Sequence, residues 1–272
     1  MRLKFLGTAA AEGWPALFCE CDACVRAGTL GGKNVRTRSS CLIDDTYMVD
    51  FSADTYMHKL MYNLKLSRVE HIFVTHSHYD HFYPHDFKIR IEGFAYIKNK
   101  AVLNVYGNSD VKKRFDNALG SMNIKDTVSY NLVEPFKYFK AGEALVMPLP
   151  ASHSKAENCF IYIIEIDKKV LLYGHDSGYY KEEVWNEISK HKFNGVILDC
   201  TSGPTSQRDY HMGIITDGEI KERMLKIGSA NDQTKFIINH FSHNINMMHN
   251  EIVKIAEPYN FIVSYDGFDI EI

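Results

Sequence analysis

Four apolar runs in this chain end in, or shortly before, a histidine or an aspartate, and this pattern limits the fold more than any other feature of the sequence. The runs, each with its polar residue, are 69–76 with His76, 144–149 with His153, 170–174 with Asp176 and 235–240 with His240. Short runs of this kind predict β-strands. Because ligand sites in α/β sheets gather at the carboxyl ends of strands, we expect the four residues to meet in one pocket.

Further strands and helices are predicted along the chain. The strands are 2–6, 40–44, 46–51, 101–107, 160–166, 195–200 and 261–265, and the helices are 53–64, 181–190, 216–227 and 242–258. Thr216 with Glu219 is a candidate capping box for the third helix, and Ser242 is a candidate N-cap for the fourth. The order predicts an α/β protein in which two packed mixed β-sheets carry helices on their outer faces. We expect a single domain, 1–272, with two halves at roughly 1–150 and 151–272.

The composition is that of a globular protein, with 45% hydrophobic and 24% charged residues. The net charge of −3 gives no electrostatic reason to expect a nucleic acid or an anionic membrane as the main partner. The first residues, MRLKFLGTAAAEG, are too broken for a secretion signal, and no run approaches the ~18 apolar residues of a membrane span. We therefore expect a cytoplasmic protein whose six cysteines are thiols or metal ligands.

The segment THSHYDHF, residues 75–82, concentrates four coordinating side chains in six positions. They are His76, His78, Asp80 and His81. In an extended segment, residues i and i+2 point the same way, so His76 and His78 can face one metal. Imidazoles together with a carboxylate suit zinc, manganese or iron, and the segment therefore predicts a metal site.

The segment FCECDAC predicts a metal site of another kind. Its thiols, Cys19, Cys21 and Cys24, can surround one tetrahedral zinc, which needs a fourth ligand. The spacing leaves that ligand open among Cys41, Cys159, Cys200 and the remaining histidines.

The segment THSHYDH resembles the H-x-H-x-D-H signature of the metallo-β-lactamase superfamily. Four more motifs of that family follow its order along the chain: MVDFSAD, PLPASHSK, LLYGHDSG and IINHFSH. The resemblance covers nearly the whole chain and implies an αβ/βα sandwich with a two-metal hydrolytic centre. It implies the following ligands: His76, His78 and His153 for one metal, Asp80, His81 and His240 for the other, and Asp176 as the bridge.

The resemblance also implies that Asp50, which follows an earlier strand, orients the ligand loop through hydrogen bonds. His175 directly precedes Asp176. Because neighbouring residues of a strand face opposite ways, we interpret His175 as a polar residue that is not a ligand.

The N-terminal segment GTAAAEGWPALFCECDACVRA resembles one branch of the superfamily, the phosphoribosyl 1,2-cyclic phosphate phosphodiesterases. That resemblance implies that His243 completes a structural zinc site with the three cysteines. It also implies that His211, in RDYHMG, is the general acid that protonates the leaving group. The expected cofactors are thus two catalytic divalent metals, zinc or manganese or iron, and one structural zinc. The candidate catalytic residues are His211 and Asp80, and Asp80 is also an expected metal ligand.

Two bridged metals lower the pKa of a shared water, a chemistry that suits hydrolysis of phosphodiesters, lactones, thioesters or β-lactams. The leading hypothesis is attack of that water on a small cyclic phosphodiester such as phosphoribosyl 1,2-cyclic phosphate. The alternatives are an RNA-processing nuclease, a lactonase or thioesterase, and a non-catalytic accessory protein like the homologue in pyrroloquinoline quinone biosynthesis. The seven filled ligand positions favour catalysis.

Three basic residues are candidate contacts for a substrate phosphate: Arg36, Arg38 and Lys155. Solvated loop charge is an equally good interpretation of all three. We expect a small phosphorylated substrate as the partner, neither a membrane nor a nucleic acid, and the sequence leaves a homodimer open.

Overall fold

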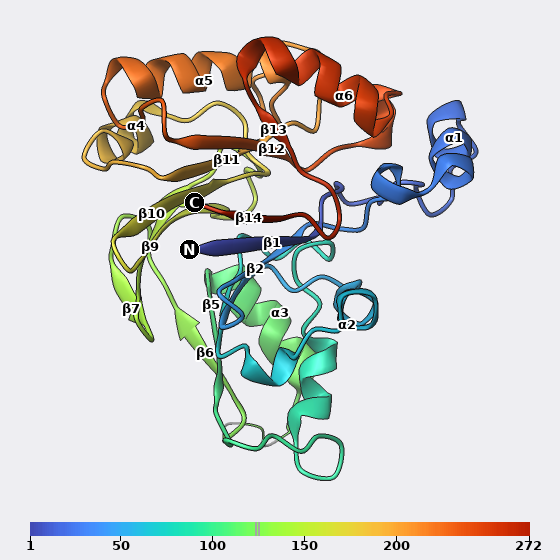
Figure 1. Ribbon diagram of the computed structural model, residues 1–272. Coiled ribbons are helices and arrows are strands. Elements are labelled where there is room, and N and C mark those ends of the chain that lie inside the picture. Colours follow the sequence, from blue (N-terminus) through green and yellow to red (C-terminus); the bar gives the residue numbers. More distant parts are fainter. Residues whose placement is uncertain (123, 125) are drawn as a thin grey trace.

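The computed structural model describes residues 1–122, 124 and 126–272, and in it two seven-stranded sheets pack face to face with helices on their outer sides (Figure 1). The predicted fold class is confirmed. The first sheet has the order β14-β1-β2-β3-β4-β5-β6. Its strands are β14 (Asp269–Glu271), β1 (Arg2–Gly7), β2 (Ser40–Ile43), β3 (Tyr47–Val49), β4 (His71–Phe73), β5 (Leu103–Gly107) and β6 (Val128–Leu132).

The second sheet has the order β13-β12-β11-β10-β9-β8-β7. Its strands are β13 (Ile262–Val263), β12 (Lys235–Asn239), β11 (Gly195–Asp199), β10 (Lys169–Gly174), β9 (Phe160–Ile166), β8 (Ala144–Pro150) and β7 (Phe139–Ala141). The chain passes from the first sheet to the second after β6, and β14 returns to pair with β1. The termini therefore lie side by side in the middle of the molecule (Figure 1).

Each sheet is antiparallel on one side and parallel on the other. In the first sheet β3, β4, β5 and β6 run parallel, and in the second β10, β11, β12 and β13 do so. Parallel neighbours end at the same edge of a sheet. The residues that follow β3, β4, β10, β11 and β12 are thus brought to one edge of the sandwich.

Strand β9 contributes side chains to two hydrophobic cores, one on each face of the second sheet. Its residues alternate between two faces, as the period of a strand requires. Phe160, Tyr162 and Ile164 belong to the core between the sheets, whereas Ile161 and Ile163 belong to the core between the second sheet and its helices. A third cluster packs the outer face of the first sheet against its own helices.

The described residues form six α-helices. They are α1 (Asp22–Leu30), α2 (Thr55–Tyr62), α3 (Ser109–Leu119), α4 (Glu182–Ile188), α5 (Ile214–Lys226) and α6 (His249–Ala256). Helix α1 lies to one side of the sheets (Figure 1). Figure 1 shows α4, α5 and α6 over the second sheet. The 3₁₀ turns are Gly32–Asn34, Leu66–Arg68, Pro84–Arg90, His243–Ile245 and Glu257–Tyr259. Within the described ranges, no helix is long and apolar enough to cross a membrane.

Both predicted helix caps are wrong. Helix α5 begins at Ile214 after Gly213, so Thr216 lies inside the helix and is fully buried. Ser242 accepts a hydrogen bond from the Asn244 amide and caps the short 3₁₀ turn, not α6. Tertiary burial at Thr216 outweighed the local capping signal.

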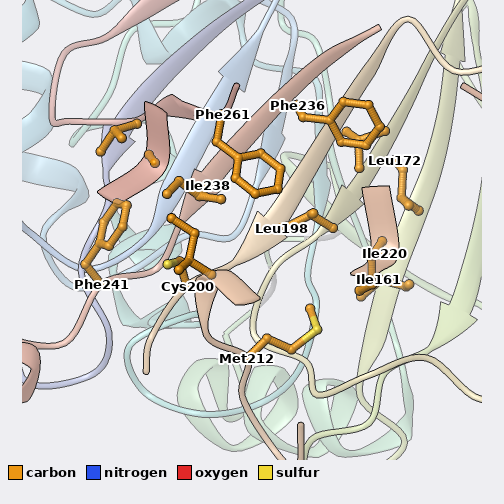
Figure 2. Packing of buried hydrophobic residues seen from close by; sticks show 14 of the residues in the cluster. Ile161, Leu172, Leu198, Cys200, Met212, Ile220, Phe236, Ile238, Phe241 and Phe261 are labelled. Atoms are coloured by element: carbon orange, nitrogen blue, oxygen red, sulfur yellow. The ribbon is translucent and has the colours of Figure 1, made fainter. Parts of the chain in front are cut away.

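The core under α5 offers a test of the packing (Figure 2). Leu198 on β11 is fully buried beside Ile220 and Met212, while Leu225 on α5 is 38% exposed. We expect Leu198→Ala to lower the free energy of unfolding by about 2–5 kcal/mol, because it leaves a cavity. Leu225→Ala, the same change at a half-exposed site, should cost much less. Urea denaturation of both variants measures the difference, and equal losses would contradict this packing.

Candidate metal centre

Three residues of the predicted centre have backbone conformations that side-chain-bearing residues seldom adopt. Asp50, Asp176 and His240 follow β3, β10 and β12, and their φ angles are 61°, 51° and 64°. Left-handed backbone is uncommon outside glycine and concentrates at functional sites. Each strand thus stops in a sharp turn that leaves its polar side chain at the shared edge.

His76, His78 and His153 lie together, as predicted. His76 Nε2 is 2.8 Å from His78 Nδ1, and that atom is 3.4 Å from His153 Nε2. The three imidazoles can offer their nitrogens to one ion. His153 reaches the other two from the loop after β8, so the set joins the two sheets.

Asp176 lies between the two predicted ligand sets. Its Oδ2 is 3.3 Å from His76 Nε2 and 3.1 Å from His81 Nε2. Its Oδ1 is 3.4 Å from His153 Nδ1 and 3.9 Å from His240 Nε2. Each oxygen thus approaches one histidine of each set, so the carboxylate lies between the two sets, where a bridging ligand would lie.

The second predicted set also converges. His81 Nε2 is 3.1 Å from Asp80 Oδ2, and the rings of His81 and His240 are 5.4 Å apart at their centroids. All seven residues expected from the sequence therefore meet at one site. Most of them are buried, while His78 is exposed and His153 is partly so.

Each buried histidine of the two predicted ligand sets has a hydrogen-bonding group beside its Nδ1. His81 Nδ1 donates to Asp50 Oδ2 at 2.7 Å, His76 Nδ1 lies 3.0 Å from Thr75 Oγ1, and His240 Nδ1 lies 2.7 Å from Thr201 Oγ1. This arrangement turns Nε2 toward the centre in every case. Among the described residues, the buried atoms left without a hydrogen-bond partner include His81 Nε2, His240 Nε2 and Asp176 Oδ1. Such unpaired atoms fit a site built for metal ions.

Burial and neighbouring charges shift the pKa of several ligands, and although burial opposes it, Asp80 and Asp50 raise the pKa of His81 well above its usual value. Burial lowers the pKa of His240 to about 4, which keeps the imidazole neutral. Burial works against ionisation of Asp176, but His240, His211 and His81 outweigh it and hold the pKa of Asp176 well below its usual range. A neutral imidazole and an ionised carboxylate are the forms that bind metals.

His211 lies at the rim of this centre. Its Nδ1 is 3.2 Å from both Asp176 Oδ1 and Asp199 Oδ2. Burial opposes the charged imidazole, but the carboxylates of Asp199 and Asp176 prevail and raise the pKa of His211 to about 11. The two carboxylates thus favour the charged form of His211, whereas in its neutral form His211 lies close enough to join Asp176, Asp199 and His240 around an ion.

Asp199 is a residue that the sequence analysis did not single out. It ends β11 and is fully buried. Its carboxylate accepts hydrogen bonds from Thr201 and from the Met212 amide, and it lies beside His211. Asp199 lies at the end of the predicted strand 195–200, and Asp50 was chosen for a similar position. The sequence therefore contained a signal that could have identified Asp199.

Glu157 is a second missed residue, and it fixes the histidine loop. Its carboxylate accepts hydrogen bonds from Ser77 N at 2.7 Å and from Ser77 Oγ at 2.6 Å. Asn108 Nδ2 donates to the same carboxylate at 2.8 Å, and Arg114 donates to the Ser77 carbonyl. Ser77 stands between two ligands, so these contacts set the positions of both. No local pattern in the sequence marks Glu157.

Asp50 is hydrogen-bonded to the predicted ligand loop. It accepts hydrogen bonds from the backbone and the hydroxyl of Thr75 and from His81. His175 Nε2 lies 3.3 Å from the same carboxylate, and His175 Nδ1 lies 3.2 Å from Asn239 Nδ2. Strand β10 ends at Gly174, so strand alternation does not govern His175 and Asp176. His175 instead lies beneath the centre as a buried partner of Asp50.

The three cysteines gather around His243. Cys19 Sγ and Cys21 Sγ lie 3.8 Å and 3.4 Å from His243 Nδ1, and Cys24 belongs to the same cluster. The Cys24 amide and His243 lower the pKa of Cys21 to about 6, whereas burial raises the pKa of Cys24 to about 11. Three sulfurs and one nitrogen at these separations suit a tetrahedral zinc.

The three candidate phosphate contacts lie in different surroundings. Arg36 is buried, where its guanidinium donates to Thr8 and the Ser264 carbonyl. Arg38 is paired with Asp54 at 2.7 Å. Lys155 is exposed. Arg36 is thus enclosed in the protein, and Arg38 is occupied by an acid.

A cavity of about 370 Å³ opens beside the centre. Ligand residues His78, Asp80, His153, Asp176 and His240 line it together with His211. The remaining lining residues are Ala10, Ala11, Glu12, Thr201, Ser242 and Asn244. This volume suits a small molecule.

Comparison with known proteins identifies relatives of this arrangement. The family model of the beta-lactamase superfamily domain matches residues 46–241. No curated protein sequence matches the chain.

Three solved structures illustrate the similarity. A diphosphatase from the PhnP family has a TM-score of 0.77 at 19% identity, covering 100% of this chain and 97% of its own. Zn²⁺-bound PqqB from Methylobacterium extorquens has a TM-score of 0.72 at 15% identity, with 100% of both chains covered. The short form of human tRNase Z has a TM-score of 0.64 at 15% identity, covering 100% and 99%. At such identities the likeness establishes the fold.

The Glu157 contacts can be tested by metal binding. We expect Glu157→Ala to weaken binding at His76, His78 and His153 by about 10- to 100-fold, because the loop between them loses its anchor. Glu157→Gln retains an acceptor for the Ser77 amide and should lie between this variant and the parent. Glu143→Ala, an exposed glutamate, is the control. Zinc titration against a chromogenic chelator measures the affinities, and unchanged affinity in Glu157→Ala would refute the role.

Proposed function

The chain belongs to the beta-lactamase superfamily, and we propose that it hydrolyses a small phosphodiester with the help of two divalent metals. The observation that carries the proposal is the position of Asp176, whose two oxygens approach both histidine sets, with His211 beside it. A cyclic diester such as phosphoribosyl 1,2-cyclic phosphate is the substrate type that we put forward.

The residues present fit a pair of metals. Histidine nitrogens and aspartate oxygens are ligands for zinc, manganese and iron. The unpaired Nε2 atoms of His81 and His240 and the unpaired Oδ1 of Asp176 are aimed into the centre. Two bound metals would supply an activated water and would neutralise the charge on a phosphate. In our proposal His76, His78 and His153 hold one ion, Asp80, His81 and His240 hold the other, and Asp176 bridges them.

His211 supplies the proton in this proposal. Asp199 and Asp176 stabilise the imidazolium, so a proton is held at the rim of the cavity. A phosphodiester with an alkoxide leaving group needs that proton, whereas an acidic phenolate does not. This requirement favours an alkyl phosphodiester over a thioester, because a thiolate leaves with less need of an acid.

The role of His211 predicts a dependence on the leaving group. We expect His211→Gln to lower kcat/KM for an alkyl phosphodiester by about 10²- to 10⁴-fold. The loss for bis(p-nitrophenyl) phosphate should be much smaller. His85→Gln, an exposed histidine, serves as the control. Steady-state rates with zinc-loaded and manganese-loaded protein provide the measurement, and equal losses on both substrates would exclude the proton-donor role.

The reaction class needs a wider panel of substrates. It would include a cyclic phosphodiester, an RNA precursor, a lactone and a thioester, together with a diphosphate because one structural relative is named a diphosphatase. Activity confined to the lactone and the thioester would overturn the phosphodiester proposal.

We also propose a structural zinc at Cys19, Cys21, Cys24 and His243. It would hold the N-terminal loop, whose residues Ala10 to Glu12 form a wall of the cavity.

Metal content tests this third site. We expect three metals per parent chain and one zinc fewer in Cys21→Ser, because that change removes one of four ligands. Cys200→Ser is the control, since Cys200 is buried outside the cluster. Elemental analysis of protein purified without chelators measures the content, and equal zinc in parent and Cys21→Ser would rule out the site.

A further inference from the structure

We propose that hydrogen peroxide joins Cys21 and Cys24 in a reversible disulfide, and that this oxidation releases the zinc of the cysteine cluster. The inference goes beyond the proposed hydrolysis and rests on the structural zinc that we propose at that cluster. All six cysteines are free thiols in the structure. Position and exposure therefore decide which of them an oxidant can join.

Cys21 and Cys24 stand on the first turn of helix α1. Cys21 is its N-cap and Cys24 is its third residue, so the pair has the spacing Cys-x-x-Cys. The amide of Val25 donates to the carbonyl of Cys21 at 3.0 Å, which closes this turn. The sulfurs of the pair lie within 4.8 Å of each other. Disulfide oxidoreductases open and close a disulfide at the same spacing, so the bond can form within one turn of the helix.

Exposure sets the order in which the two thiols react. Cys21 is exposed, whereas Cys24 is 3% exposed and its sulfur accepts a hydrogen bond from the Ala16 amide at 3.2 Å. The loop ahead of the helix also stands in solvent, since Phe18 is 96% exposed. Dissolved peroxide therefore reaches Cys21 first, and Cys24 is the neighbouring thiol that completes the disulfide.

The reaction balances with one hydrogen peroxide for each disulfide. The sulfur of Cys21 attacks the peroxide, the oxygen–oxygen bond breaks, and a sulfenic acid and a hydroxide form. The sulfur of Cys24 then displaces the hydroxyl group from the sulfur of Cys21, so that the sulfur–sulfur bond forms and water leaves. Two electrons pass from the two sulfurs to the peroxide. When the sulfurs begin as zinc thiolates, two protons from solvent complete the two waters.

Oxidation of this pair removes half of the proposed zinc ligands. The thiolate is the form of cysteine that binds a metal. Cys19 and His243 alone leave a structural zinc two ligands short of the four that it requires. The zinc is therefore released, and the N-terminal loop loses its link to the segment around His243. Glu12 on that loop lines the cavity, so the released loop borders the catalytic centre.

The other cysteines are poorer partners for Cys21. Cys41, Cys159 and Cys200 are buried and lie outside the cluster. Cys19 lies in the cluster, but it is two residues before Cys21 in the sequence. A disulfide across a single residue closes a smaller ring than one across two. Cys24, on the same helical turn, is thus the preferred partner.

Treatment of the zinc-loaded parent with hydrogen peroxide tests the inference. Thiols would be counted with a chromogenic disulfide reagent in denaturant, released zinc with a chromogenic chelator, and the disulfide located by peptide mapping. We expect the loss of two thiols and the release of one zinc per chain, with Cys21 joined to Cys24. Dithiothreitol with added zinc should restore both. An unchanged thiol count, a disulfide to any other cysteine, or oxidation that dithiothreitol does not reverse would overturn the inference.

Serine variants make the test specific to the pair. Cys21→Ser and Cys24→Ser each remove one partner and should keep their remaining thiols under the same treatment. Cys19→Ser removes a zinc ligand but keeps the pair, so it should still form the disulfide. Cys200→Ser, outside the cluster, should respond as the parent does. If Cys21→Ser or Cys24→Ser loses two thiols, or if Cys19→Ser loses none, the pair is wrongly assigned.

Failure of this inference is distinct from failure of the proposed function. Hydrolysis of bis(p-nitrophenyl) phosphate by the parent tests the phosphodiesterase activity, and the thiol count and the peptide map are read without it. If that compound is cleaved while peroxide leaves the thiols intact, the proposed function stands and the inference is wrong. If the parent holds no zinc at the cluster, the structural zinc and its release are both wrong.

Discussion

The buried carboxylate of Asp50 is the interaction on which the centre depends. It receives hydrogen bonds from Thr75 and His81 on the first sheet, and His175 from the second sheet lies against it. Burial alone would favour the neutral acid, but His81 and His175 outweigh it and hold the pKa of Asp50 well below its usual range. The ionised group therefore joins the two sheets at the point where the ligand histidines begin, and its loss would leave buried donors unpaired.

In the second sheet, Asp199 is a buried aspartate with similar contacts. Each aspartate ends a strand or directly follows one, each accepts a hydrogen bond from a threonine hydroxyl, and each helps to orient imidazoles. Asp50 contacts His81, while Asp199 contacts His211 and His240. The two sheets have the same order of antiparallel and parallel neighbours, although Asp50 and Asp199 stand at the ends of strands that do not correspond, β3 and β11. The centre is thus assembled from two similar edges facing each other.

The sequence predicted those parts of the site whose signals are local. The crowding of His76, His78, Asp80 and His81 lies within six positions, and apolar strands precede the other ligands. Glu157 was not predicted because its role depends on its hydrogen bonds to Ser77, which is 80 residues away in the sequence. The cap at Thr216 was wrong because burial in the core decided where α5 begins. Helix α1 was missed because its nine residues begin directly after Cys21, include Cys24 and carry only a weak apolar pattern. Local patterns thus identify the chemistry, whereas the supporting contacts depend on the finished fold.

The cysteine cluster has a consequence for how the chain unfolds. Cys19 and His243 are 224 residues apart, so a zinc held by both would close most of the polypeptide into a ring. Because the fold brings these ligands together, a zinc bound there would add its binding free energy to the stability of the folded chain. The zinc that holds the N-terminal loop beside the cavity would then also keep that loop joined to the segment around His243, near the other end of the sequence.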